Sequence, residues 1–386
     1  MRGVSIVGIG STPFGRLEAE EDIVKLAVDA CSDAIRDSGI KYSSIQALYL
    51  GNFVGERLAA QGALASVVGG RLGILGIPGT KVEGACASGG IAIREGFITV
   101  ASGLYDFVLV VGVERMSNMP IGDITAALAT AGDEKYEMRT GLTFPGAFAM
   151  IMEEHMRSYG TSREQVAQVS IKNHQNGLNN PKAQFRRATN MDEVINSRFI
   201  AEPIRLFDCP PISDGAAAAI LCPTELARDL PGKSVQILGS GHSTGPSTLT
   251  QMPDLTTFSA SIQAAQQAYD MAGISAADVD VAEVHDCFTI AEIIATEDLG
   301  FFRKGEGGQA VESGETALDG LYPVNPSGGL IAKGHPVGAT GLAQIYELVT
   351  QLRGTAVNQI AHPDIALAHN LGGAGAVATV HVLGRR

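Results

Sequence analysis

The chain has 386 residues, of which 45% are hydrophobic and 18% are charged, and its formal net charge is −13. This composition predicts a globular protein with a sizeable core and excludes a disordered chain. The acidic balance argues against nucleic acid as the main partner. The sequence contains no run of about 18 apolar residues, so we expect no membrane span.

The N-terminal residues and the cysteines indicate a cytoplasmic protein. Residues 4–10 form an apolar run that is typical of a buried strand and not of a secretory signal. The five cysteines lie far apart and no CxxC pair occurs, so neither disulfides nor a structural zinc site is expected. Free thiols are therefore available for chemistry in a reducing compartment.

Strands and helices alternate along the chain. Apolar residues at helical spacing over 20–38 predict a helix that ends at Gly39, and another helix is expected from Cys86 to about residue 102. Continuous apolar strands between such helices favour a parallel-rich sheet covered by helices, which is an α/β fold. The other elements that we expect are strands at 47–50, 107–111, 235–239, 279–284, 365–368 and 377–383 and helices at 255–272 and 336–353.

The order of elements after residue 235 repeats the order at the start of the chain. If Ala34 is aligned with Ala268, Gly39 falls on Gly273 and the strands that follow coincide without a gap. Any two strand–helix–strand units share some of this spacing. The length of the match nevertheless favours an internal duplication of one α/β unit.

The duplication divides the chain into three parts. We expect the first half of the core in residues 1–114 and the second half in residues 235–386. Residues 115–234 contain Met-rich, Asn-rich and basic stretches and are predicted to be a loop insertion that returns to the first half. Long insertions of this kind usually serve binding.

The first candidate site is Cys86 in the segment Gly84–Gly90, where a Gly-rich turn enters a helix. Free N–H groups and partial positive charge at a helix N-terminus favour a thiolate, so we expect a lowered thiol pKa and a site that can hold an oxyanion. The small neighbours of Cys86 leave room for a substrate. The alternative is a buried cysteine with a purely structural role.

The second candidate is His335, which lies in the Gly-rich segment Asn325–Gly341 just before Pro336. Proline favours the first helical position, so we expect a helix to begin there. In the duplicated frame His335 occupies nearly the place of Cys86, and the two helix starts would face each other. A base would then lie beside a nucleophile, as covalent catalysis requires. Without the duplication, a single histidine at a loop edge would more often be structural.

The third candidate is the pair His285 and Cys287, directly after the predicted strand at 279–284. Catalytic groups of α/β proteins often lie beyond the carboxyl ends of strands. Asp286 between them is alternatively a cap for a helix that begins two or three residues later. A metal site is not expected, because no further pair of ligands lies nearby in the sequence.

These motifs resemble the thiolase superfamily over essentially the whole chain. Gly84–Gly90 is similar to the nucleophile turn, Glu114–Pro120 to the Met-Ser-Asn segment after the third strand, and Asn325–Gly341 to the NxxGGxxxxGHPxGxxG signature. The resemblance implies the thiolase fold, a duplicated five-layered α-β-α-β-α core with an inserted loop domain. It also implies coenzyme A and acyl-CoA as substrates, with no covalently bound cofactor.

The resemblance is to a particular branch of the superfamily. The main branch carries Asn-Glu-Ala-Phe where this chain has His285–Phe288, and a second catalytic cysteine where this chain has Asn370. The loop is similar to that of sterol-carrier-protein thiolases and their archaeal and bacterial relatives, in which the loop cysteine is thought to substitute. By this resemblance Cys287 is the proton donor. Many prokaryotic relatives work with a small partner that carries a zinc ribbon and an OB-fold.

The resemblance implies reversible Claisen chemistry on 3-oxoacyl-CoA through an acyl-Cys86 intermediate, with His335 as the base. Backbone N–H groups of Cys86 and Gly372 would hold the acyl oxyanion, and His335 and His285 the enolate oxygen. The residues expected to contact the substrate are Met116, Asn325 and Gly329.

Other functions and assemblies are compatible with the same residues. Ketoacyl synthases, which condense with decarboxylation, also use a Cys-His-His set like Cys86, His285 and His335, and some members of the superfamily are non-catalytic scaffolds. The acyl group is open between acetoacetyl, medium-chain fatty and aromatic groups. We expect a homodimer or a dimer of dimers, in which a strand such as 107–111 extends across the two-fold axis.

Overall fold

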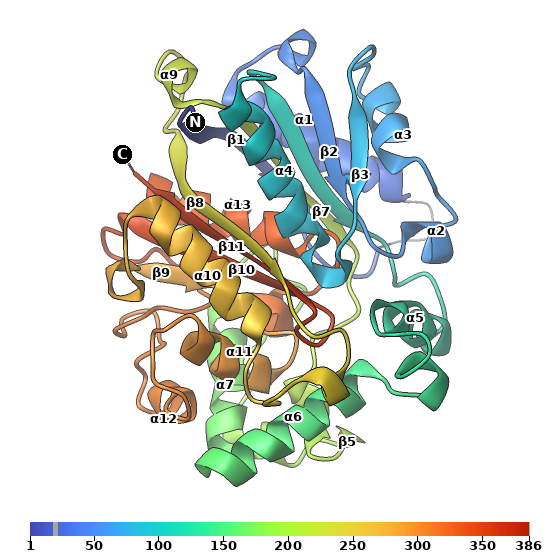
Figure 1. The fold of residues 1–386 in the computed structure, drawn as a ribbon, viewed down its shortest axis with the longest axis vertical. Helices are drawn as coiled ribbons and strands as arrows, with labels where there is room; N and C mark the ends of the chain where they lie inside the picture. The colour runs from blue at the N-terminus through green and yellow to red at the C-terminus, as the bar shows by residue number, and fades with distance from the viewer. Residues whose placement is uncertain (18–21, 386) are drawn as a thin grey trace.

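A nine-stranded sheet forms the centre of the computed structural model, which describes residues 1–17 and 22–385. The strands lie in the order β3-β2-β4-β7-β1-β8-β11-β10-β9 (Figure 1). The first half of the chain contributes β1 (Val4–Ser11), β2 (Ala47–Gly51), β3 (Gly79–Val82), β4 (Val108–Glu114) and β7 (Gly215–Pro223). The second half contributes β8 (Val235–Thr244), β9 (Val281–Glu283), β10 (Ile365–Gly372) and β11 (Val377–Gly384).

The two halves of the sheet repeat each other in reverse order about the antiparallel pair β1–β8. Helix α1 (Ile23–Ser38) ends at Gly39 with a φ of 71°, and α10 (Ser259–Ala272) ends at Gly273 with a φ of 68°. Both glycines adopt the left-handed conformation that ends a helix without strain. The predicted duplication is therefore confirmed. Residues 20 and 21 of the first predicted helix lie outside the described residues.

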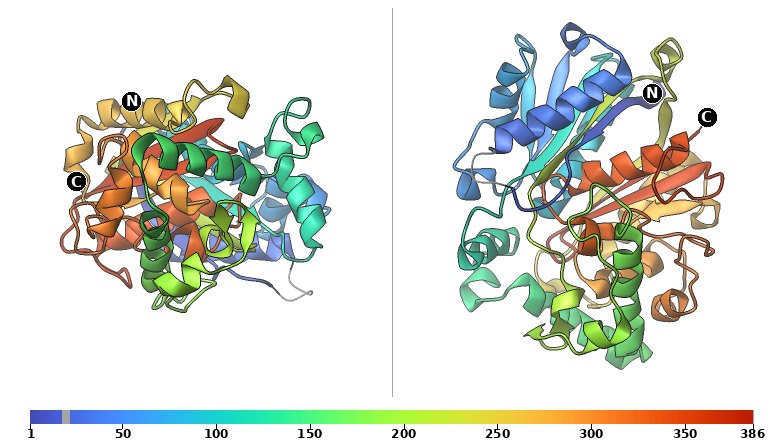
Figure 2. Two further views of the ribbon diagram at one scale, coloured as in Figure 1. Left: turned by 90° about the horizontal axis from the view of Figure 1, so that it is seen from below. Right: turned by 180° about the vertical axis from the view of Figure 1, so that it is seen from behind.

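Helices arrange the two sheet halves into five layers. α1 packs on β1, β4 and β7, and α10 packs on β8 and β11 (Figures 1 and 2). α4 (Ser88–Ser102) and α13 (Thr340–Arg353) contact each other and lie between the halves, α4 against β2 and β4 and α13 against β10 and β7. This is the α-β-α-β-α order that the resemblance to the thiolase superfamily implies.

The starts of α4 and α13 touch through glycine residues. A Cβ on Gly341 would lie 2.3 Å from the backbone nitrogen of Gly90, and a Cβ on Gly89 would lie 3.0 Å from the carbonyl oxygen of Gly338. No side chain larger than hydrogen fits between such backbones. The glycines therefore allow the two helix N-termini, one from each half, to meet at the middle of the molecule.

We expect the Gly341→Ala variant to be destabilised by roughly 1–3 kcal/mol or more, because the added methyl group overlaps the backbone of the other helix. The free energy of unfolding in urea measures the loss. Gly70→Ala is the matched control, since Gly70 lies in α3 (Leu64–Arg71) and an added Cβ would have no atom within 4 Å. Equal unfolding midpoints for Gly341→Ala and the wild type would contradict the close contact.

The predicted start of α13 at Pro336 is wrong. The Pro336 carbonyl accepts the N–H groups of Ala339 at 2.9 Å and Thr340 at 3.1 Å, which closes a turn, and the helix begins at Thr340. Before this turn, Gly329–Lys333 form a single turn of π-helix. Such turns are rare and have no simple sequence pattern, although they are frequent at functional sites.

The sequence pattern does not reveal β7, although this strand lies at the centre of the sheet between β4 and β1. Its four alanines, Ala216–Ala219, have little intrinsic preference for strands. In the sheet they are buried, and their small side chains allow α1 and α13 to approach β7 from its two faces. Packing between elements overrides the local propensity here.

The expected dimer strand at 107–111 is also wrong. β4 has β2 paired in parallel along one edge and β7 paired antiparallel along the other, so neither edge is open to a second subunit. The strand at the edge of this half of the sheet is β3, which pairs with β2. Any sheet that continues into another copy of the chain on this side would begin at β3.

The segment between β4 and β7 lies at one end of the sheet (green in Figures 1 and 2). Its helices α6 (Phe144–Tyr159) and α7 (Arg163–Gly177) pack against α11 (Thr289–Asp298) of the second half. The remaining elements are α2 (Gly55–Leu58), α5 (Ile121–Leu128), α8 (Met191–Ile195), α9 (Thr224–Ala227), α12 (Gly307–Glu312) and the small hairpin of β5 (Phe199–Ala201) and β6 (Ile204–Arg205). Within the described ranges, no helix is both long and apolar enough to cross a bilayer.

Candidate active site

Cys86 lies in a short 3-10 turn, Ala85–Ala87, between β3 and α4. The Ser88 hydroxyl stabilises this turn through two hydrogen bonds. It accepts the Gly84 N–H at 3.0 Å and donates to the Ala85 carbonyl at 2.6 Å. Ser88 is fully buried, whereas Cys86 is half-buried. The turn therefore presents the thiol at the start of α4, as the sequence predicts.

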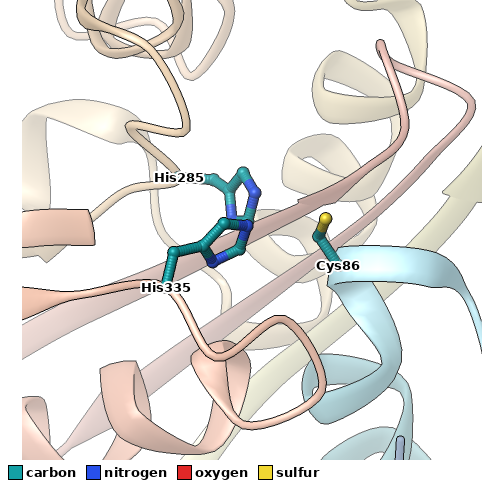
Figure 3. A group of neighbouring side chains, drawn as sticks. All are labelled: Cys86, His285 and His335. Carbon is teal, nitrogen blue, oxygen red and sulfur yellow. The ribbon is translucent and has the colours of Figure 1, made fainter. Parts of the chain in front are cut away.

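His335 follows the π-helical turn and faces Cys86 (Figure 3). Its Nδ1 lies 2.7 Å from the Thr340 hydroxyl, which donates its only proton to the Pro336 carbonyl at 3.1 Å. With the hydroxyl proton on the Pro336 carbonyl, we assign the ring proton to Nδ1 and the lone pair to Nε2. Burial lowers the pKa of His335 from 6.5 to about 3, so the ring is neutral and able to accept a proton.

His285 lies just beyond β9 and next to His335 (Figure 3). The ring centroids of the two histidines are 5.0 Å apart, and the angle between the rings is 80°. The Cys86 sulfur and one nitrogen of each ring all lie within 4.8 Å of one another. The structure thus brings together a thiol from the first half and two imidazoles from the second half. The duplication predicts that Cys86 and His335 meet, and the structure adds His285 to this pair.

The expectation of a lowered pKa for the Cys86 thiol is wrong. Burial, and to a lesser extent the nearby carboxylate of Glu114, raises this pKa from 9.0 to about 12. The backbone N–H groups of Gly373 and of Cys86 itself act in the opposite direction but are weaker. The helix start therefore contributes less than burial does, and the resting thiol keeps its proton until a base removes it.

Gly372, the residue predicted to hold an oxyanion, lies against the nucleophile turn. A Cβ on Gly372 would be 2.3 Å from the Gly84 carbonyl oxygen, so only glycine fits. The backbone N–H that interacts with the Cys86 sulfur is that of the next residue, Gly373. Two consecutive glycines thus line the nucleophile, and the oxyanion role of Gly372 stays a prediction.

Cys287 is buried among the apolar residues of the second half, with 7% of its surface exposed. Burial raises the pKa of its thiol well above 9.0, and the negative charge that Cys86 would carry raises it further. The two thiols are therefore close enough to interact electrostatically. A thiol that holds its proton this firmly suits a proton donor better than a nucleophile.

Asp286 does not cap the helix that follows it. α11 begins at Thr289 without a side-chain cap, and the Asp286 carboxylate instead accepts the backbone N–H groups of Leu330 at 2.7 Å and Ile331 at 3.3 Å. A Cβ on Gly329 would lie 2.2 Å from this carboxylate, so only glycine fits at position 329. Asp286 thus ties the loop of His285 to the π-helical turn that leads to His335.

The residues predicted to contact substrate have protein partners in the structure. The Asn325 amide accepts the Val284 N–H at 2.9 Å and donates to Glu292 at 2.7 Å, so both its ends are used to order the loop. Met116 is fully buried in the apolar cluster against which Cys86 packs. Gly329 lies at the start of the π-helical turn. Substrate contact by these three residues stays a prediction.

Two further residues, Glu114 and Asn370, help to form the site, although the sequence predicts no catalytic or binding role for either. Glu114 is buried at the end of β4 and accepts the backbone N–H groups of Phe53 at 2.9 Å and Gly338 at 3.2 Å, which links the first half to the His335 loop. Burial raises the pKa of Glu114 to about 7. Asn370 is a buried amide inside β10. An acid or amide within an otherwise apolar strand is the signal that marks both residues.

The buried histidines behind the site predict a pH dependence of stability. His381 donates from Nε2 to the Gly90 carbonyl at 3.0 Å, and burial lowers its pKa from 6.5 to about 4. Between these values the unfolded chain binds a proton that the folded chain does not, so stability falls as the pH falls. We expect wild-type protein to lose about 1.4 kcal/mol more per pH unit below 6.5 than His381→Gln, in which the donor is kept. Urea unfolding at pH 7 and pH 5 compares the two, and parallel losses would contradict the assignment.

Comparison with known proteins covers nearly the whole chain. The family model described as Thiolase, N-terminal domain matches residues 4–225, and the model described as Thiolase C-terminal domain-like matches residues 241–385. An acetyl-CoA acetyltransferase from Methanothermobacter thermautotrophicus is 46% identical over 386 residues and covers 100% of both chains. Sterol carrier protein 2 from Oryctolagus cuniculus is 37% identical, over 99% of this chain and 72% of the relative.

A solved structure shows the same architecture. It is described as an Ltp2-ChsH2(DUF35) aldolase, and it superposes with a TM-score of 0.87 at 27% sequence identity. The match covers 99% of this chain and 98% of the other chain. The similarity therefore includes both halves and the insertion between them.

Proposed function

This chain belongs to the thiolase family, and we propose that it cleaves and forms 3-oxoacyl-CoA reversibly through an acyl group carried on Cys86. It is an acyltransferase of the thiolase type. The observation that supports this reaction most directly is the arrangement of Cys86, His285 and His335, whose sulfur and ring nitrogens lie within 4.8 Å of one another. A nucleophile, a base and a hydrogen-bonding group at this spacing suit acyl transfer.

In the cleavage direction, His335 accepts the proton of the Cys86 thiol and the sulfur attacks the 3-keto carbon. The bond between the second and third carbons of the acyl chain then breaks. Cys86 keeps the acyl group, and the electron pair leaves in the enolate of the shorter acyl-CoA. Proton transfer creates a thiolate beside an imidazolium, and their attraction in a site with little water offsets the raised pKa of the thiol.

The second half of the reaction restores both thiols. Cys287 protonates the enolate carbon, which releases the shorter acyl-CoA and leaves a thiolate on Cys287. A CoA thiol then attacks the acyl group on Cys86, and its proton passes to Cys287. The imidazolium of His335 returns its proton to the departing sulfur of Cys86. Every proton is accounted for by these three side chains, and no bound cofactor is required.

Two oxyanions arise in this sequence, one on the acyl group and one on the enolate. The backbone N–H groups of Cys86 and Gly372 are assigned to the first, because Gly372 lies against the nucleophile turn. The side chains of His335 and His285 are assigned to the second. Loss of one donor of this kind typically lowers the rate about 10²- to 10³-fold.

The acyl group of the natural substrate is short, as in acetoacetyl-CoA. Cys287 lies in one apolar cluster with Phe288 and with Phe148 of α6, whose rings stack with centroids 4.6 Å apart, and such bulky neighbours favour a short acyl group. A relative with 46% identity is named an acetyl-CoA acetyltransferase. Cys86 itself packs against a cluster of buried apolar residues, which leaves little space for a long acyl chain on this side of the sulfur. The cluster consists of Val54, Leu58, Met116, Ile124, Ala127 and Val337.

Thiolysis of a panel of 3-oxoacyl-CoAs tests both parts of the proposal. We expect acetoacetyl-CoA to give the highest kcat/KM, with lower values for medium-chain and aromatic substrates. Cleavage of no member of the panel, with or without a co-expressed partner protein, would contradict the reaction. A maximum at a longer or aromatic acyl group would contradict the short acyl group and leave the reaction intact.

The working assembly is a homodimer or a dimer of dimers in the cytoplasm, with a small zinc-ribbon and OB-fold protein as a further partner. The edge strand β3 supports the dimer, because it offers unpaired backbone groups to a second copy. The five cysteines, none of which is in a disulfide, favour a reducing compartment. The structural neighbour whose description includes DUF35 supports the additional partner. Light scattering of the protein alone and with the product of a neighbouring gene tests these assemblies.

A further inference from the structure

The orientation of the Asn370 amide is determined by two backbone groups. Its Oδ1 accepts the Gly90 N–H at 3.1 Å, and its Nδ2 donates to the Cys86 carbonyl at 3.0 Å. A backbone N–H can only donate and a carbonyl can only accept, so the oxygen and nitrogen of the amide cannot be exchanged. Asn370 and both of its partners are buried or half-buried, which leaves no room for the amide to turn toward solvent.

The second proton of the same amide nitrogen meets His285. Nδ2 of Asn370 lies 3.0 Å from Nδ1 of His285. A donor at this position requires a lone pair on Nδ1, because two N–H groups cannot face each other at hydrogen-bonding distance. His285 is buried, and burial together with His335 and His369 lowers its pKa well below 6.5. The ring is neutral, so its single proton lies on Nε2.

We propose that Asn370 is a positioning residue that holds His285 as the Nε2–H tautomer, and that this also prevents a metal ion from binding between Cys86, His285 and His335. Thr340 has the opposite effect on His335, whose proton is on Nδ1. The two imidazoles therefore present different hydrogen-bonding groups to the site. His335 offers a lone pair that accepts a proton, and His285 offers an N–H that donates a hydrogen bond to a substrate oxygen.

The exclusion of metal follows from the same geometry. Thiolate sulfur and imidazole nitrogen both bind zinc, and here the three ligand atoms are within 4.8 Å of one another (Figure 3). An imidazole binds a metal through a lone pair, which Nε2–H lacks. If the proton moved to Nδ1, it would face the amide protons of Asn370, which cannot turn over. Without His285, only Cys86 and His335 remain as ligands.

The Asn370→Asp variant tests this role. A carboxylate accepts a proton from Nδ1, which frees the lone pair on Nε2 and creates the carboxylate–histidine pairing that supports zinc ligands. We expect nitrogen NMR of ¹⁵N-histidine-labelled protein to show His285 as Nε2–H in the wild type and as Nδ1–H in the variant. Zn²⁺ affinity, measured by competition with a chromophoric chelator, is expected to rise roughly 10- to 100-fold. The His285→Gln variant identifies the His285 signals by their loss.

Two controls separate this effect from added charge and from other cysteines. Asn190→Asp makes the same substitution at an exposed helix cap of α8 and is expected to leave Zn²⁺ affinity unchanged. Adding Cys86→Ser to Asn370→Asp is expected to remove the gain, and Co²⁺ in place of Zn²⁺ reports thiolate ligation by its absorbance. Persistence of the gain without Cys86, or no gain in Asn370→Asp, would overturn the metal exclusion.

The tautomer of His285 in wild-type protein decides the proposal even if the variant does not fold. An Nδ1–H signal for His285 in the wild type would overturn it. The donor role toward substrate rests on the proposed thiolase reaction, but the tautomer and the metal affinity do not. Both are measured without any acyl-CoA, so a failure of the proposed reaction and a failure of this inference give different results.

Discussion

The Cys86→Ser variant is expected to lose turnover by roughly 10⁵-fold or more, as enzymes do when a covalent nucleophile is removed. A hydroxyl group ionises far less readily than a thiol, so transfer of its proton to His335 is much less favourable than transfer from Cys86. Two assays measure the loss of turnover and of the acyl intermediate. One is thiolysis of acetoacetyl-CoA, and the other is mass spectrometry of the Cys86 peptide after incubation with acetyl-CoA, which should show an acetyl group only in the wild type.

Cys209→Ser is the matched control for this substitution. Cys209 is half-buried, packs against the core of the second half and bonds weakly to the Arg205 carbonyl at 3.4 Å. We expect its turnover to stay close to that of the wild type. An acetyl group that remains in Cys86→Ser and is found on another cysteine would show that the nucleophile has been assigned to the wrong residue.

The Cys287→Ala variant is expected to separate the two halves of the reaction. Thiolysis should fall about 10²- to 10⁴-fold, because the enolate loses its proton donor. Acylation of Cys86 by acetyl-CoA should continue, since that step produces no enolate and the departing CoA sulfur can leave as a stable thiolate without a proton from Cys287. The measurement is therefore a pair of assays on the same protein, thiolysis of acetoacetyl-CoA and formation of the acetyl group on the Cys86 peptide.

Cys222→Ala controls for the removal of a buried thiol, since Cys222 is fully buried in the core of the first half. It should leave both assays nearly unchanged. Thiolysis at the wild-type rate in Cys287→Ala would remove Cys287 from the mechanism and favour a decarboxylating synthase, which needs no donor at this position. Loss of both assays would instead indicate that Cys287 supports the structure of the site.

The architecture follows from the sequence because periodicity and repetition are strong signals. The match of Gly39 with Gly273 predicts two helices that end in the same left-handed conformation, as they do. The same signals do not predict β7, because its alanines adopt the strand conformation only through packing against α1 and α13. Contacts between elements that are distant in sequence decide such cases, and no local pattern contains them.

In the site, too, local sequence patterns predict some features, and contacts between distant residues decide the others. Cys86, His335 and His285 are visible from the sequence because each follows a turn or a strand end, and the repeat places Cys86 beside His335. The raised pKa of Cys86 cannot be predicted from the sequence, because it depends on burial and on Glu114, which approaches Cys86 only in the folded protein. The tautomers of the two histidines depend on individual hydrogen bonds, one that His285 accepts from Asn370 and one that His335 donates to Thr340, and these form only in the folded protein.

The place of β1 in the middle of the sheet has a consequence for how the chain folds. This strand is synthesised before its partners β7 and β8, and its Ser5 bonds to Thr224, which lies 219 positions later. Loop closure on this scale is slow, and until it happens β1 has two open edges. A ribosome-bound nascent chain therefore displays a long-lived apolar strand, which is the kind of segment that chaperones bind and that aggregates when they are limiting.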